Sequence, residues 1–170
     1  MCPVLAKGEI EKLLHGNFPL IEGYIDLDTQ IQPNGFDLTV RDICIFLGYG
    51  TIGKTNDSRI ISSVKQLSYE SSGYVNLPSG PYLVTFNEIV HLPRNLMAIG
   101  KPRSSLLRCG VTVHNAVWDA GYSGRSQALM VVYNEHGFRL ERNARILQLI
   151  FLSLSSEADG YSGIYQNENL

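Results

Sequence analysis

The stretch Arg145-Ile146-Leu147-Gln148-Leu149-Ile150-Phe151-Leu152-Ser153-Leu154 contains the longest apolar run in the chain. Between Ile146 and Leu154 only Gln148 and Ser153 interrupt it, and the run is far too short to cross a bilayer as a helix. A short apolar run of this kind, bounded by polar segments, is typical of a buried β-strand. It predicts a core strand.

Four more runs of this type follow one another along the chain, separated by turn residues: Phe36 to Phe46, Tyr82 to Leu92, Gly110 to Trp118 and Ala128 to Tyr133. This rhythm predicts an all-β barrel or sandwich. Two short helices are expected beside it. Lys7 to His15 carries apolar residues at helical spacing and ends before Gly16, a suitable C-cap, and Ser104 to Arg108 follows an extended stretch, with Ser104 or Ser105 at its N-cap.

Length and composition set limits on the function. The 170 residues, 44% hydrophobic and 18% charged, predict one folded domain over residues 1–170. A net charge of -2 provides no sequence-wide attraction for nucleic acid or for an anionic membrane, so neither is an expected partner. The start Met1-Cys2-Pro3 lacks the pattern of a secretory leader, and a cytoplasmic protein is expected.

Metal-ligand spacing is absent from the sequence. Three cysteines and four histidines are scattered without a Cys-x-x-Cys or His-x-x-x-His pair, so neither a disulfide framework nor a zinc site is predicted. Gly48 to Gly53 matches Gly-x-Gly-x-x-Gly, but no helix pattern follows it. We interpret it as a turn within a polar excursion or hairpin spanning Gly48 to Gly73.

A phosphate-binding element is suggested by Arg103-Ser104-Ser105 at the start of the second helix. Backbone N–H groups point outward at a helix start, and a neighbouring arginine adds charge and paired donors. The alternative is a capped surface turn.

Five segments carry a resemblance in their order along the chain: Gln32-Pro33-Asn34-Gly35-Phe36-Asp37-Leu38, Gly100-Lys101-Pro102-Arg103-Ser104-Ser105-Leu106, Trp118-Asp119-Ala120-Gly121-Tyr122-Ser123-Gly124, Arg145-Ile146-Leu147-Gln148-Leu149-Ile150 and Gly160-Tyr161-Ser162-Gly163-Ile164-Tyr165-Gln166. Together they resemble the superfamily of deoxyuridine triphosphatases and deoxycytidine triphosphate deaminases. The resemblance spans roughly residues 30–166, and it is nearest to a triphosphatase with archaeal or deaminase-like motifs.

The resemblance implies a fold and an assembly. It predicts a distorted β-barrel or jelly roll of the β-clip type, with an N-terminal helix in residues 1–16 and a C-terminal arm over residues 157–170. It also implies a homotrimer with sites between subunits, dUTP as substrate and Mg²⁺ on the triphosphate. The implied reaction is water attack on the α-phosphorus, which releases dUMP and pyrophosphate.

The resemblance also assigns roles to single residues. Asp119 matches the carboxylate that takes a proton from the attacking water, the role of a general base; an ordinary turn aspartate is the alternative. Tyr122 would lie against the deoxyribose, and Gln148 would contact the triphosphate or a metal-bound water. Asp37 would hold a metal-bound water or brace a neighbouring basic residue. Core roles are the alternatives for these three.

Two further parts of the implied site concern the base and the arm. Val111 to Trp118 is interpreted as a β-hairpin arm with His114 and Asn115 near its tip, and such an arm reads the base largely through backbone groups. Tyr165 and Gln166 lie in the C-terminal arm, which closes over the nucleotide in the family.

The choice between the two chemistries depends on one carboxylate. The deaminase branch carries a glutamate on the strand after the Asp-x-Gly turn, and here that position falls near Val131, with Glu135 four residues further on. The segment also runs two residues long, which predicts a bulge. We therefore expect a dUTP diphosphatase. The alternatives are a dCTP deaminase or bifunctional enzyme, and a nucleotide-binding relative without turnover.

Overall fold

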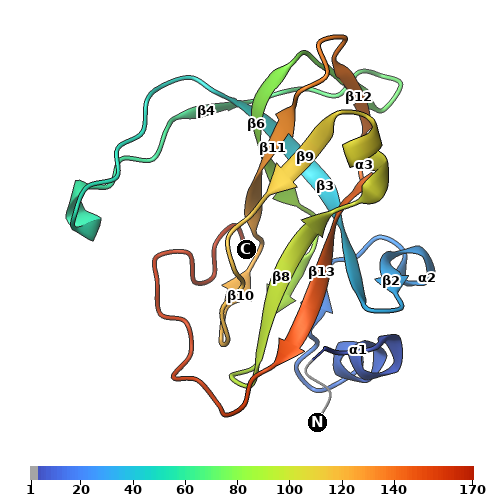
Figure 1. Ribbon diagram of the computed structural model, residues 1–170, viewed down its shortest axis with the longest axis vertical. Coiled ribbons are helices and arrows are strands. Elements are labelled where there is room, and N and C mark those ends of the chain that lie inside the picture. The colour runs from blue at the N-terminus through green and yellow to red at the C-terminus, as the bar shows by residue number, and fades with distance from the viewer. Residues whose placement is uncertain (1–3) are drawn as a thin grey trace.

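A computed structural model describes residues 4–170 of the chain. Its main sheet runs in the order β8-β13-β3-β6-β11-β9, and β2 and β4 each pair with β3. The end strands β8 and β9 also lie against each other, so the sheet nearly closes on itself (Figure 1). The predicted distorted β-barrel is confirmed.

The strands of this sheet are β2 (Ile31–Gln32), β3 (Gly35–Phe46), β4 (Val64–Gln66), β6 (Gly80–Phe86), β8 (Leu96–Pro102), β9 (Val111–His114), β11 (Gln127–Val132) and β13 (Arg145–Ser153). A second sheet joins β1 (Ile21–Glu22), β7 (Ile89–His91) and β10 (Ser123–Gly124). A third pairs β5 (Tyr74–Leu77) with β12 (Phe138–Glu141).

The barrel core is built where β13 lies between β3 and β8. Leu147, Leu149 and Phe151 of β13 are fully buried, as are Phe36 and Leu38 of β3. Burial of such side chains stabilises a fold by about 1.5–3 kcal/mol each. The apolar run at Arg145 to Leu154 therefore forms the buried core strand that it was predicted to be.

The helices follow the prediction closely and differ at their ends. Helix α1 (Lys7–Leu14) ends with His15 rather than Gly16 as its C-cap, and α3 (Ser104–Arg108) has Arg103 as its N-cap. The expected serine cap of α3 is therefore wrong, because Ser104 and Ser105 already lie inside the first turn. A short helix, α2 (Leu27–Gln30), and a single 3-10 turn, η1 (Asn56–Ser58), were not predicted. Met1 to Pro3 of the predicted N-terminal segment, including Cys2, lie outside the described residues.

Two strand predictions need correction. Tyr82 to Leu92 is two strands, β6 and β7, separated at Asn87 and Glu88. The segment Val111 to Trp118 is not the predicted hairpin: β9 pairs with β11, and the chain then crosses to Ala98 of β8, where Trp118 forms an isolated bridge. Three residues, 115–117, separate these two pairings, too few to form a returning strand.

The bulge predicted for the segment after the Asp-x-Gly turn does not occur in β11. That strand pairs with β6 and with β9 in an unbroken register. Arg125 and Ser126 instead lie outside the ladder, between β10 and β11. The Ser126 hydroxyl points toward Trp118 and Tyr122.

The polar segment after β3 is an arm that extends away from the barrel (Figure 1). Its two sides meet at the Thr51 and Ile60 bridge, and β4 returns it to the edge of β3. The glycine-rich motif Gly48 to Gly53 lies on this arm, so the predicted excursion is confirmed. The interpretation of the motif as a turn is wrong, because Thr51 within it pairs with Ile60 on the returning side and the chain reverses at η1. In residues 4–170, no helix is long and apolar enough to span a membrane.

Candidate active site

Asp119 is held in a turn that is anchored on both sides. Before it, Trp118 exchanges two backbone hydrogen bonds with Ala98, of 2.9 and 3.0 Å. After it, the Tyr122 amide donates to the Asp119 carbonyl at 3.1 Å, and Gly121 adopts a left-handed φ of 80°. A Cβ atom on Gly121 would lie 2.7 Å from Cα of Gly160, so the turn needs glycine there. The Asp119 side chain is left exposed.

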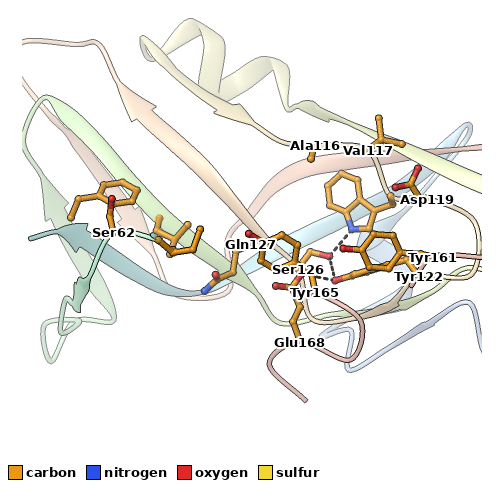
Figure 2. Close-up of a pocket in the computed structure, with 14 residues that line it drawn as sticks. Ser62, Ala116, Val117, Asp119, Tyr122, Ser126, Gln127, Tyr161, Tyr165 and Glu168 are labelled. Atoms are coloured by element: carbon orange, nitrogen blue, oxygen red, sulfur yellow. Dashed lines mark hydrogen bonds between the residues drawn. The ribbon is translucent and has the colours of Figure 1, made fainter. Parts of the chain in front are cut away.

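This turn forms one wall of a cavity of about 380 Å³. Figure 2 shows Asp119 near Tyr122 and Val117 at one end of the cavity and Ser62 at the other. The lining is largely apolar, with a few polar groups that converge, which is typical of small-molecule sites. It comes from the base of the arm, from β6 and β11, from the Asp119 turn and from the C-terminal segment: Phe46, Ile61, Ser62, Leu83, Ala116, Val117, Trp118, Asp119, Tyr122, Ser126, Gln127, Tyr161, Tyr165 and Glu168.

Tyr122 is the most constrained residue of this wall. It is 6% exposed, its ring meets that of Tyr161 edge to face at 5.8 Å, and its hydroxyl donates to Oε1 of Glu168 at 2.9 Å. Burial raises the pKa of Tyr122 far above its ordinary value, and the nearby Glu168 carboxylate acts in the same direction. The phenol therefore stays protonated and presents a fixed flat surface.

A second group of predicted residues forms a cluster around Asp37, which is 1% exposed on β3. Its Oδ2 atom lies 3.0 Å from Nε of Arg103 and 3.4 Å from Nη1 of Arg145. Burial raises the pKa of Asp37, and the two guanidinium groups oppose that shift. Asp37 thus braces two basic side chains, one of the two roles considered for it.

Gln148 extends this cluster across the sheet. Its neighbours in the ladder are Asp37 on β3 and Lys101 on β8, so the three side chains share one face. Gln148 is half-buried, while Ser104 and Ser105 are exposed at the start of α3, next to Arg103. Lys101, Arg103 and Arg145 carry three positive charges in this region, against the one carboxylate of Asp37. The surplus positive charge is suited to phosphate oxygens.

His114 and Asn115 lie between the two groups. Both line a separate shallow groove with Lys101, and this groove shares Ala116 and Val117 with the Asp119 cavity. His114 is exposed, and the Asn115 amide donates to the Ala116 carbonyl at 2.8 Å. The site residues therefore form two neighbouring groups with the 115–117 loop between them.

The C-terminal segment packs against the Asp119 turn. Tyr165 lines the cavity, and the Gln166 side chain accepts from the Ser123 amide and donates to the Gly121 carbonyl, both at 3.1 Å. Tyr161 donates from its amide to the Ala120 carbonyl at 2.8 Å. A glycine-rich tail could have frayed, but this one is tied to the turn by its own hydrogen bonds.

The two positions considered for the deaminase glutamate, Val131 and Glu135, lie outside the Asp119 cavity. Val131 pairs with Thr112 and Pro81 and does not line the Asp119 cavity, while Glu135 is exposed in the loop before β12 and lines another depression. The sequence reasoning missed Glu168, the second carboxylate of the cavity. Its position two residues after Gln166, near the end of the tail, carried no signal, because only the folded tail brings it to Tyr122.

The side chains present offer few ligands for a magnesium ion of the protein's own. Within residues 4–170, no three His, Cys, Asp or Glu side chains gather closely enough to hold a metal ion. Mg²⁺ commonly keeps several waters and is held by one or two carboxylates together with substrate phosphates. The chain fits an ion that arrives on a triphosphate, and Asp37 is the acidic group nearest to the phosphate-binding residues predicted here.

The fold and the two residue groups define a β-barrel with an apolar cavity beside a basic cluster. The family model of dCTP deaminase-like proteins matches residues 4–154, and the chain belongs to this family. A solved dCTP deaminase from Agrobacterium tumefaciens has the same fold, with a TM-score of 0.69 and 23% identity over 89% of this chain and 48% of that one.

Curated relatives match nearly the whole chain. The protein of Methanosarcina mazei is 52% identical over 167 residues, which is 98% of each chain, and that of Archaeoglobus fulgidus is 47% identical over the same length. A protein of Aeropyrum pernix is 40% identical over 141 residues, which is 82% of this chain. All three are described as probable deoxyuridine 5'-triphosphate nucleotidohydrolases.

Proposed function

We propose that this chain hydrolyses dUTP to dUMP and pyrophosphate. The observation that carries the proposal is the Asp119 carboxylate, exposed at the edge of a cavity and held in the same turn as the buried Tyr122. A water molecule beside Asp119 would lose its proton to the carboxylate as it attacks the α-phosphorus. Relatives about half identical over the whole chain, described as dUTP nucleotidohydrolases, support the same substrate.

The positions of Arg103, Asp37 and Tyr122 suggest their roles in binding the substrate. Arg103, with the start of α3, would bind phosphate oxygens, and Asp37 would keep the guanidinium oriented. Tyr122 would pack against the deoxyribose and leave no room for a 2′-hydroxyl. Mg²⁺ would neutralise charge on the triphosphate oxygens when bound with the substrate. A cytoplasmic location remains a prediction.

One assay tests the reaction. The protein is incubated with dUTP and with dCTP, with and without Mg²⁺, and pyrophosphate and ammonia are followed separately. We expect Mg²⁺-dependent pyrophosphate release from dUTP and no ammonia from dCTP. Ammonia release would support deamination, the second candidate, which is favoured only by the presence of Glu168 in the cavity. Tight nucleotide binding without either product would indicate a relative that has lost turnover.

A homotrimer with shared sites is part of the proposal. Asp119 lines the cavity, whereas Arg103, Ser104 and Ser105 do not. A triphosphate that contacted Arg103 of one copy and Asp119 of the next would use both groups at once. Closed cyclic assemblies repeat such a heterologous contact around the ring.

Mixing two inactive variants tests this sharing. Asp119→Asn and Arg103→Ala are each expected to be nearly inactive alone. Subunits randomised by co-refolding should recover roughly a quarter of wild-type turnover, because one interface in four pairs two intact halves in a ring. Mass photometry or light scattering gives the oligomeric state of each sample. No recovery in a mixture that forms trimers would place both groups of one site on a single chain.

A further inference from the structure

Three buried side chains form a hydrogen-bonded series that ends on the C-terminal tail. Nε1 of Trp118 lies 2.6 Å from Oγ of Ser126, and the same Oγ lies 2.9 Å from the hydroxyl of Tyr122. The Tyr122 hydroxyl lies 2.9 Å from Oε1 of Glu168. Trp118, Ser126 and Tyr122 are each no more than 6% exposed. Figure 2 shows Ser126 and Tyr122 joined by a dashed line on the same side of the cavity as Asp119.

The chemistry of the four groups fixes the direction of every bond. An indole N–H can only donate, so Ser126 accepts from Trp118. An ionised carboxylate can only accept, so Tyr122 donates to Glu168. The single proton of Ser126 is then left to donate to the Tyr122 oxygen. Every hydrogen bond in the series therefore points from Trp118 toward the Glu168 carboxylate. Hydrogen bonds aligned in one direction in this way strengthen one another.

Two members of the series, Trp118 and Tyr122, bracket Asp119 in the sequence. Trp118 directly precedes it, and Tyr122 closes the turn by donating its amide to the Asp119 carbonyl. Ser126, the central member, lies in the two-residue stretch between β10 and β11. The side chains on both sides of the exposed carboxylate are therefore tied together beneath it.

Glu168 is placed by backbone pairing of the tail with this same region. The Arg125 amide donates to the Glu168 carbonyl at 2.9 Å, and the Asn167 amide donates to the Ser123 carbonyl at 2.7 Å. Burial raises the pKa of Glu168, and its hydrogen bond from Tyr122 opposes that shift. The bond between a phenol and this half-buried carboxylate is charge-assisted and is stronger than a neutral one.

We propose that Glu168 is a positioning residue, which acts through Tyr122 and Ser126 on Trp118 and so holds the Asp119 turn in its working geometry. The proposal rests on the proposed hydrolysis for its kinetic consequence. It assigns the last residues of the tail a task that does not require them to touch the nucleotide. Loss of Glu168 would leave the Tyr122 hydroxyl without its anionic acceptor and would loosen both flanks of Asp119.

A spectroscopic experiment tests the series without any substrate. Trp118 is the one tryptophan in the sequence, so the protein's indole signal comes from this site. In Glu168→Ala and Ser126→Ala we expect a weaker near-ultraviolet circular dichroism band and an acrylamide quenching constant raised about twofold or more, because the buried indole becomes more accessible. The control is Glu157→Ala, which removes an exposed carboxylate of the same segment and should leave both signals unchanged.

A kinetic experiment tests the positioning role. Glu168→Ala should lower kcat for dUTP about tenfold with KM changed by less than about threefold, since small misplacements of reacting groups slow chemistry more than binding. Glu168→Gln keeps an acceptor oxygen without its charge, so its kcat should lie between those of wild type and Glu168→Ala. Glu157→Ala should match wild type.

The two readouts separate this inference from the proposed function. An indole signal in Glu168→Ala equal to that of wild type would overturn the inference whatever the activity. A changed signal with unchanged kcat would also overturn it, because the series would then be structural only. If the wild-type protein releases no pyrophosphate from dUTP, the proposed function fails, and the positioning role fails with it even if the indole signal changes as expected.

Discussion

Asp119→Asn is expected to reduce dUTP turnover by about 10³-fold, because an amide cannot take the proton of the attacking water and general bases contribute roughly 10²–10⁴-fold. The substitution keeps the size of the side chain, and the turn is held by backbone hydrogen bonds from Trp118 and Tyr122 that it does not touch. Binding of a non-hydrolysable α,β-imido analogue of dUTP, measured by calorimetry, should survive within a few-fold.

The matched control for this substitution is Asp57→Asn, an exposed aspartate on the arm. It should turn over dUTP at the wild-type rate. Undiminished pyrophosphate release by Asp119→Asn would remove Asp119 from the role of general base. Loss of analogue binding together with turnover would assign it to substrate binding instead.

Glu88→Ala is expected to cost the fold about 3 kcal/mol of unfolding free energy or more, because it leaves buried donors without an acceptor. Glu88 is fully buried and accepts three hydrogen bonds: from the Thr39 amide at 2.9 Å, the Thr39 hydroxyl at 2.6 Å and the Gln30 side-chain amide at 2.7 Å. Chemical denaturation followed by circular dichroism measures the loss, with Glu135→Ala as the exposed control. A loss equal to that of the control would contradict the prediction.

The unfolding free energy lost in Glu88→Ala should depend on pH in a direction that follows from the pKa of Glu88. Burial raises the pKa of Glu88 above its ordinary 4.5, and the hydrogen bonds from Thr39 and Gln30 oppose that shift. The folded state therefore binds this proton more tightly than the unfolded state. The stabilisation that follows is fully present below about pH 4.5 and is lost as the pH rises through the raised value. The gap between wild type and Glu88→Ala should accordingly be wider in acid than at neutral pH.

Sequence patterns predicted those helices and strands that are specified by residues close together in the chain. The apolar run at Arg145 to Leu154 became β13, and Ser104 to Arg108 became α3, because alternation, helical spacing and turn residues act over a few neighbours. Helix α2 was missed because its four residues are too few for a period to be recognised. The hairpin expected at Val111 to Trp118 was wrong because β11 and β8, both distant in sequence, provide better partners than the segment provides for itself.

The residues of the site divide in the same way, into those that a motif predicted and those that only the fold brings into place. The resemblance pointed to Asp119, Arg103 and Tyr122 by their motifs, and the folded chain places Asp119 and Tyr122 on one cavity and Arg103 on another cluster. Ser126 and Glu168 carry no motif. Each acquires its place from a bond to a residue on another element, across 8 positions to Trp118 and 46 positions to Tyr122.

The order of residue types along the chain was sufficient to predict the barrel class and the family, since residue types and short spacings encode these directly. Which buried polar side chains pair with one another is decided only in the folded chain. Glu88 with Gln30, Asp37 with two arginines and Glu168 with Tyr122 are pairs selected by strand pairing and desolvation, and those forces act only after distant segments have been brought into contact.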